Sequence, residues 1–163
     1  MSKRILADSA DISFKLFECD NQAAQDGLLS GDFDAIVCVA NAMKPGIAYD
    51  TLLEAEGYVL APAAHPFASR PNVALSDLAG EPMALLDLPI VSEYYAAQFD
   101  MAGVAPPVVA TATSLEMVRS LVGQGVGCSL LHMTTANAVT YAGDEVRPVP
   151  LAPAIEPFRL VCG

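Results

Sequence analysis

The stretch TSLEMVRSLVGQGVGCSLL, residues 113–131, carries the clearest structural signal in this chain. Its first half places apolar residues at helical spacing: Leu115, Val118, Leu121 and Val122. Thr113 and Glu116 have the spacing of a capping box, with the threonine as N-cap and the glutamate as third helical residue. The glycines at positions 123 and 125 end the helix, and the apolar run at 126–131 predicts a strand.

The same alternation of helix and strand extends outward to both ends of the chain. The run at 33–39 is nearly all apolar, which favours a strand buried on both faces. With an alternating segment at 12–17 and the helix between them, it predicts a β–α–β unit of a parallel sheet. The order of elements indicates an α/β protein in two lobes. The other expected elements are helices at 20–29, 92–103 and 134–142, strands at 57–61, 82–88, 107–112 and 158–162, a loop at 41–51, a turn or short helical piece at 76–80 and an extended stretch at 146–153.

Length and composition are those of a globular protein with one domain or two small lobes. The 163 residues are 53% hydrophobic and 17% charged, which is enough to bury a core. No apolar run approaches the roughly 20 residues that a membrane helix needs. The basic start at residues 1–4 is not followed by the apolar segment of a secretion signal, so we expect a cytoplasmic protein with no membrane partner.

Charge and cysteine content exclude several classes of function. A net charge of −11 repels phosphate backbones, so direct nucleic-acid binding by these residues is not expected. The four cysteines are widely spaced and form no pair typical of a zinc site. Cys38 and Cys128 lie in apolar runs, which predicts buried thiols in a reducing compartment. We therefore expect no metal.

Motifs for catalysis or nucleotide binding are weak. The glycines at 123, 125 and 127 follow a helix and open a strand, whereas a dinucleotide fingerprint follows a strand and opens a helix. The two histidines, His65 and His132, have no motif partner for nucleophilic catalysis. The acidic pairs at 54/56 and 144/145 are typical of solvated surface. The sequence therefore predicts neither a catalytic residue nor a cofactor.

One pattern does point to ligand binding. Small polar residues lie at predicted strand ends or helix starts: Asn21, Asn41, Thr113, Ser114 and His132. Helix N-termini offer free N–H groups and a partial positive charge, which suit carboxylates and other anions. Simple helix capping is the alternative explanation for Asn21, Thr113 and Ser114.

Four blocks of sequence resemble LysR-type transcriptional regulators, in that family's order. Residues 56–68, EGYVLAPAAHPFA, resemble a strand and its "HPLA" turn, and residues 74–82, ALSDLAGEP, resemble the "sLaDLaGEP" segment. Residues 28–35, LLSGDFDA, resemble the "LLsGelDla" run. The stretch at 113–131 resembles the family's helix and "GlGvaLLP" strand, with His132 in the usual place of proline. The resemblance covers about residues 12–151.

The resemblance implies a two-lobed α/β fold of the type II periplasmic-binding-protein kind, with mixed sheets and a hinge. Residues 1–57 and 148–163 would form lobe I, which is incomplete, and residues 58–147 would form lobe II. A small, acidic organic effector would bind between the lobes. Its implied contacts are Asn21, Asn41, Leu88, Thr113, Ser114 and His132.

The sequence also departs from the family pattern. The winged helix-turn-helix, the first strand and helix of the effector domain and the closing helix have no counterpart here, so we expect a piece truncated at both ends. The resemblance then implies DNA binding only through a helix-turn-helix domain absent from this chain, and a homodimer or higher homo-oligomer for the full-length protein. The alternatives are a transporter's solute-binding protein of the same fold, an enzyme on this fold and a remnant without function.

Overall fold

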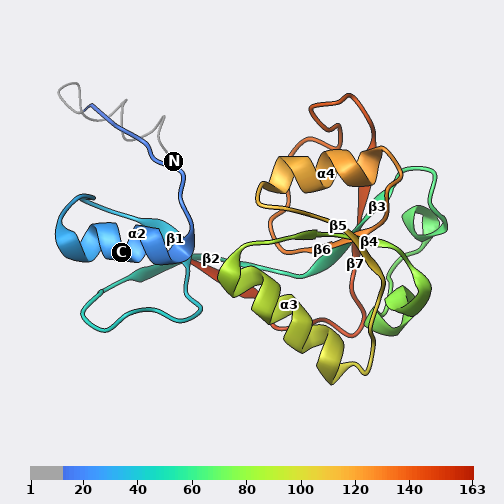
Figure 1. The fold of residues 1–163 in the computed structure, drawn as a ribbon, viewed down its shortest axis with the longest axis horizontal. Coiled ribbons are helices and arrows are strands. Elements are labelled where there is room, and N and C mark those ends of the chain that lie inside the picture. Colours follow the sequence, from blue (N-terminus) through green and yellow to red (C-terminus); the bar gives the residue numbers. More distant parts are fainter. Residues whose placement is uncertain (1–12) are drawn as a thin grey trace.

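The computed structural model describes residues 13–163 and has two lobes (Figure 1). The smaller lobe contains the two ends of the described chain, and the larger lobe contains the residues between them. The smaller lobe comprises α2 (Asn21–Ser30), β1 (Val37–Val39), β2 (Asp50–Ala55) and β8 (Phe158–Cys162). The larger lobe comprises β3 (Tyr58–Pro62), η1 (Pro66–Ser69), η2 (Leu75–Gly80), β4 (Met83–Leu86), α3 (Pro89–Met101), β5 (Val108–Ala112), α4 (Leu115–Gly123), β6 (Ser129–Leu131) and β7 (Val146–Pro150).

The smaller lobe is an antiparallel three-stranded sheet with one helix on it. Its strand order is β1-β8-β2, so the last strand of the chain is the central strand. Helix α2 begins at Asn21 because the Asp20 carboxylate accepts the N–H groups of Gln22 and Ala23, at 2.9 and 2.8 Å. It ends at Gly31, whose φ of 81° is the left-handed conformation that glycine adopts readily. The small core comprises Ala24, Ile36, Cys38 and Val161.

The larger lobe is a mixed sheet covered by a helix on each face. Strands β6, β3 and β7 are antiparallel and β4 and β5 are parallel, while the Met83–Cys128 bridge brings β4 beside the start of β6. Side chains of β3 alternate between the two faces. Val59 belongs to the core under α3, and Leu60 belongs to the core under α4. The expected mixed sheets are therefore confirmed.

The chain crosses between the lobes twice. It leaves the smaller lobe between β2 and β3, at residues 56–57, and it returns between β7 and β8, at residues 151–157. The expected lobe boundary at residue 148 falls inside β7, and all five residues of that strand pair with β3. The pairing therefore moves residues 148–150 to the larger lobe, and the remaining division of the chain stays a prediction.

The predicted parallel β–α–β unit is wrong. Residues 13–17 have no strand and are exposed, with Phe14 at 45% and Leu16 at 79%; Ile12 lies outside the described residues. Alternation of side chains produces a strand only where a neighbouring strand offers hydrogen-bond partners. The segment at 33–39 shortens to β1, which pairs antiparallel with β8 alone. Val37 is 45% exposed, so β1 is not buried on both faces.

Other local predictions have mixed outcomes. The helix at 92–103 and the strands at 57–61, 82–88, 107–112 and 158–162 are confirmed, with shifts of up to a few residues at their ends. The helix expected at 134–142 is wrong, because those residues form loops and an isolated bridge. Strand β2 was not predicted, because its exposed side chains leave no apolar pattern. No helix within residues 13–163 is both long and apolar enough to cross a membrane.

The close approach of β4 and β6 can be tested at Gly127. A Cβ atom there would lie 2.3 Å from the backbone oxygen of Pro82, which cannot move aside as a flexible side chain could. We expect Gly127→Ala to lower the free energy of unfolding by about 1–3 kcal/mol, measured by urea denaturation. Gly80→Ala is the matched control, since its Cβ would meet no atom within 4 Å. Equal stability of the two variants would contradict this packing.

Candidate functional site

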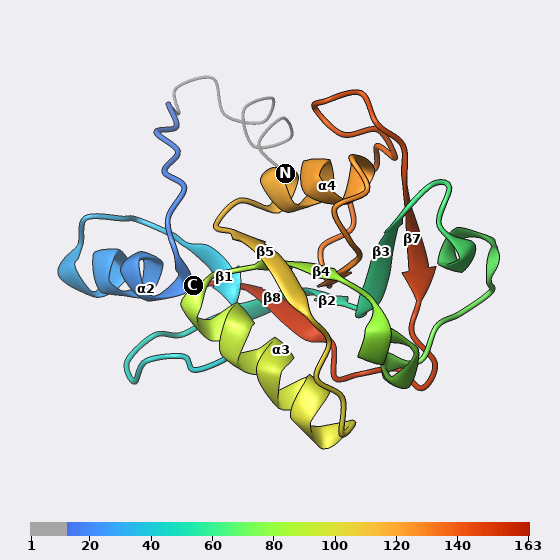
Figure 2. The same ribbon diagram turned by 45° about the vertical axis from the view of Figure 1, so that its right-hand side comes forward.

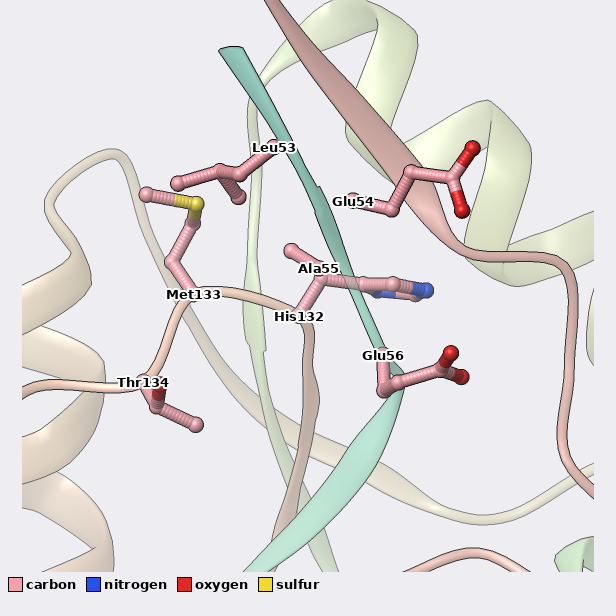
Figure 3. Close-up of a pocket in the computed structure, with 7 residues that line it drawn as sticks. All are labelled: Leu53, Glu54, Ala55, Glu56, His132, Met133 and Thr134. Atoms are coloured by element: carbon pink, nitrogen blue, oxygen red, sulfur yellow. The ribbon is translucent and has the colours of Figure 1, made fainter.

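A pocket of about 260 Å³ lies where the chain first crosses between the lobes (Figure 3). One wall is the end of β2 and the residue after it, and the other wall is the segment that follows β6. Both lobes therefore contribute to the pocket. Its lining residues are Leu53, Glu54, Ala55, Glu56, His132, Met133 and Thr134.

The pocket is apolar on one side and acidic on the other. Alternation along β2 turns Leu53 to one side and Glu54 to the opposite side. Figure 3 shows the Leu53 and Met133 side chains close together, with the carboxyl groups of Glu54 and Glu56 across from them. Within residues 13–163, no lysine or arginine side chain lines this pocket. This end of the inter-lobe space suits an apolar body and a hydrogen-bond donor.

His132 forms a buried side of the pocket and is 2% exposed. Its Nε2 lies 3.2 Å from the backbone oxygen of Glu156, and its Nδ1 lies 3.2 Å from the Tyr95 hydroxyl. A carbonyl oxygen can only accept, so Nε2 carries the proton and Nδ1 accepts from Tyr95. Burial disfavours the charged imidazolium and lowers the pKa of His132 to about 4. The ring is therefore neutral near pH 7, and both of its nitrogens already have protein partners.

Asn21 also has its polar groups occupied by the protein. Its Oδ1 accepts the N–H of Val39 at 3.0 Å, and its Nδ2 donates to the Val39 oxygen at 3.1 Å. The same Nδ2 lies 3.4 Å from the backbone oxygen of Asn41. The amide thus pairs with one side of β1 as a neighbouring strand would. The structure brings Asn21 and Asn41 together, with Asn21 holding the backbone that presents Asn41.

The other expected contacts lie at helix starts of the larger lobe. Leu88 is the N-cap residue of α3 and Ser114 that of α4, and neither helix has a side-chain hydrogen bond at its cap. Both helices begin on the side of the larger lobe that is nearer the smaller lobe (Figures 1 and 2). Thr113 and Ser114 are exposed. Among residues 13–163, no side chain therefore caps the first N–H groups of α4.

The capping box expected at Thr113 and Glu116 is wrong. Helix α4 begins at Leu115, one residue later than that motif requires, with Ser114 as N-cap. The Glu116 carboxylate instead accepts Nε of the buried Arg119 at 2.8 Å and the N–H of Tyr141 at 2.7 Å. A buried guanidinium needs a charged partner, so Glu116 is drawn to Arg119 and away from the helix cap.

Several residues of the pocket were not predicted from the sequence. The pair Glu54 and Glu56 was interpreted as solvated surface, and Met133 and Thr134 carried no signal of their own. Only their positions in the sequence could have indicated that they line a pocket. Glu54 and Glu56 lie at the first crossing, and Met133 and Thr134 follow His132. Within the described part of the chain, no group of three or more His, Cys, Asp or Glu side chains is placed to hold a metal ion.

A second hollow, of about 250 Å³, adjoins this pocket at Thr134. It lies between the loop at 134–138 and strands β3 and β7. Arg119 and Arg147 line it, but the charge of Arg119 is balanced by Glu116. Arg147 is half exposed and lies 3.8 Å from Glu145.

Comparison with known families identifies the kind of domain. Residues 3–162 match the family described as the LysR substrate binding domain. The chain belongs to this family. The resemblance seen in the four sequence blocks is thereby confirmed, as is the two-lobed fold that it implied.

Relatives of this LysR substrate-binding domain are transcriptional regulators. The chain is 29% identical over 124 residues to the uncharacterized HTH-type transcriptional regulator YybE of Bacillus subtilis, covering 74% of this chain and 42% of that protein. It is 30% identical to HinK of Pseudomonas aeruginosa, with a TM-score of 0.89 over 99% of this chain and 55% of that one. For a C-terminal domain of a probable LysR family regulator of Rhodococcus sp. RHA1, the identity is 29% and the TM-score 0.92, over 99% and 80% of the two chains. The chain thus spans about half the length of the first two relatives.

More distant structures share the fold and hold small molecules. The BenM effector-binding domain with benzoate is 20% identical, with a TM-score of 0.79, over 99% of this chain and 73% of that one. The QuiR effector-binding domain with shikimate is 18% identical, with a TM-score of 0.82, over 99% and 78%. At these identities the likeness concerns the fold alone.

The environment of His132 makes the stability of the domain depend on pH. The folded protein holds His132 at a pKa of about 4, below its ordinary 6.5, so the unfolded chain binds more protons as the pH falls between these values. The contribution of the neutral ring is complete above pH 6.5 and is lost toward pH 4. Besides the Tyr95 hydroxyl, the titratable groups near the ring are Tyr94 and the pocket residues Glu54 and Glu56, and the hydrogen bond to the Glu156 carbonyl opposes the lowering of the pKa.

We expect the free energy of unfolding to fall by up to about 3 kcal/mol more in the native protein than in His132→Gln over this pH range. Urea denaturation at several pH values measures the difference, in which the shared titration of the carboxylates cancels. Parallel pH profiles for the two proteins would show that His132 is not held neutral by burial.

Proposed function

We propose that this domain binds a small organic effector in the pocket between its lobes and passes the resulting change to a helix-turn-helix DNA-binding domain outside these residues. The observation that carries the proposal is the pocket at the first crossing, which residues of both lobes line. The chain that forms it belongs to the LysR substrate-binding family. The regulator acts in the cytoplasm as a homo-oligomer, and the domain uses no cofactor and performs no catalytic step.

The physical basis of the response is differential affinity. An effector that contacts both lobes stabilises the arrangement in which the lobes are closest, and it shifts the population toward that arrangement. The crossings at 56–57 and 151–157 are the segments that have to bend when the lobes move. The size of the response depends on the difference between the affinities for the two arrangements and not on the affinity itself.

We propose that the effector carries one carboxylate, held at the start of α4. No side chain in the described part of the chain caps this helix end, whereas the start of α2 is already occupied by Asp20. Free N–H groups and the hydroxyls of Thr113 and Ser114 suit an anion there. Glu54 and Glu56 would repel a second acidic group at the other end of the ligand, which favours a hydroxyl or amine on that side.

Five of the six residues expected from the sequence divide by role. Asn41, Leu88, Thr113 and Ser114 lie outside the seven residues that line the pocket, and they are proposed as contacts of the part of the effector that extends from it toward α4. Asn21 is proposed as a positioning residue, because its amide is bonded to the backbone of Val39 and Asn41.

Benzoate and its uncharged analogue benzamide form a matched pair of probes for this proposal. We expect isothermal titration calorimetry to detect benzoate binding, and benzamide to bind at least about tenfold more weakly. The double variant Thr113→Val, Ser114→Ala is expected to weaken benzoate binding by about tenfold, since hydrogen bonds to a charged group are lost. Ser76→Ala, at an exposed serine of η2, is the control and leaves binding unchanged.

Two results would contradict this proposal in different ways. Loss of benzoate binding in Arg147→Ala, with the α4 double variant unaffected, would move the carboxylate site to the second hollow. A screen of acidic, neutral and basic small molecules in which none binds to the folded chain would refute effector binding by these residues.

A further inference from the structure

A single backbone carbonyl on the return crossing carries two hydrogen bonds from the larger lobe. The oxygen of Glu156 accepts the hydroxyl of Tyr94, in α3, and it also accepts Nε2–H of His132, after β6, at 3.2 Å. Both lone pairs of this carbonyl are therefore used. The two donors lie on separate elements of the larger lobe, so they fix the crossing in position and in direction.

The His132 ring has no freedom to turn away from this carbonyl. Nδ1 accepts the hydroxyl of Tyr95 at 3.2 Å, and Tyr95 is itself only 2% exposed. A ring flip would present Nδ1 to the Glu156 oxygen without a proton, and it would present Nε2–H to the Tyr95 hydroxyl, which has no other acceptor within residues 13–163. Such unpaired buried groups cost about 1–3 kcal/mol each, so one tautomer and one orientation are favoured.

The same ring contacts β8, the strand with which the chain re-enters the smaller lobe. His132 stacks on Phe158, the first residue of β8, with a centroid distance of 4.0 Å and an interplanar angle of 16°. Tyr94 meets the same Phe158 ring at 4.7 Å and 61°. Stacked and edge-to-face pairs of this kind are favourable beyond the area that they bury. The ring cluster thus joins the two lobes directly.

The first crossing also passes against His132. A Cβ atom at Gly57 would lie 3.2 Å from Nε2 of His132 and 2.6 Å from Cδ1 of Ile155. Only glycine, which has no side chain, lets the outgoing crossing approach His132 and Ile155 this closely. Ile155 belongs to the return crossing. The two crossings therefore meet at the edge of one imidazole ring.

From this geometry we propose that His132 is a positioning residue that clamps both crossings to the larger lobe, and not a hydrogen-bonding contact of the effector. The clamp fixes the resting arrangement of the lobes and the shape of the wall that His132 forms in the pocket. Lobe movement then has to take place around this point. The clamp itself is independent of the proposed function, and only its effect on the effector pocket rests on it.

The clamp can be measured in the 163-residue chain without any ligand. We expect ¹⁵N spectra of the imidazole near pH 7 to show the neutral Nε2–H tautomer.

In His132→Phe, which keeps a stacking ring and removes both hydrogen bonds, amide hydrogen exchange in residues 155–160 should accelerate at least tenfold. Tyr94→Phe, which removes the other bond to the same carbonyl, should accelerate exchange in the same segment. Tyr141→Phe is the matched control, because Tyr141 is 92% exposed. It should leave amide exchange in residues 155–160 unchanged.

A second variant keeps the test valid if His132→Phe is globally unstable. The double variant His132→Phe, Tyr95→Phe also removes the buried Tyr95 hydroxyl that would otherwise lose its partner, so it should fold and still show the faster exchange. A charged ring or the Nδ1–H tautomer near pH 7 would overturn the proposal, and so would unchanged exchange in folded variants. Weaker benzoate binding in His132→Phe with unchanged exchange would make His132 a ligand contact instead. Failure of benzoate to bind at all bears on the proposed function and leaves the exchange test intact.

Discussion

The position of β8 is the constraint on which the rest of the arrangement depends. This strand comes from the end of the chain, yet it lies between β1 and β2 as the central strand of the smaller lobe. The chain therefore has to leave that lobe, complete the larger lobe and return. Closing so long a loop has an entropic cost, which pairing along both edges of β8 and full burial of Val161 help to offset. The two crossings follow directly from this strand order.

The crossings bring functional groups from distant parts of the sequence to one place. Glu54 and Glu56 arrive from β2 and the outgoing crossing, His132 from the end of β6, and the Glu156 carbonyl from the return crossing. The imidazole remains neutral because its burial lowers the pKa by more than the hydrogen bond to the Glu156 carbonyl raises it. The inter-lobe pocket thus has a neutral wall at His132 beside an acidic one at Glu54 and Glu56, and the start of α4, which no side chain of residues 13–163 caps, offers the complementary polarity.

Much of the fold could be predicted because its signals are local. Helical spacing and a terminal glycine mark α3, and apolar runs mark β3 and β4. The resemblance to the family extended these local elements to a two-lobed architecture. The sequence placed His132 after a strand and Ser114 at a helix start, and their contact with an effector stays a prediction. It could not assign Glu54 and Glu56, because a solvated carboxylate and one that lines a pocket look alike in sequence.

The sequence by itself determined the helices, most of the strands and the family, because side-chain periodicity, glycine conformation and motif order are properties of neighbouring residues. Only the tertiary structure decided that residues 13–17 remain without a strand partner, that Glu116 pairs with Arg119 and not with its own helix cap, and that both nitrogens of His132 bond to the protein. Each of these outcomes depends on which hydrogen-bond donor or acceptor lies across the fold. No local pattern encodes that partner, since the competing arrangements satisfy the same polar groups in different ways.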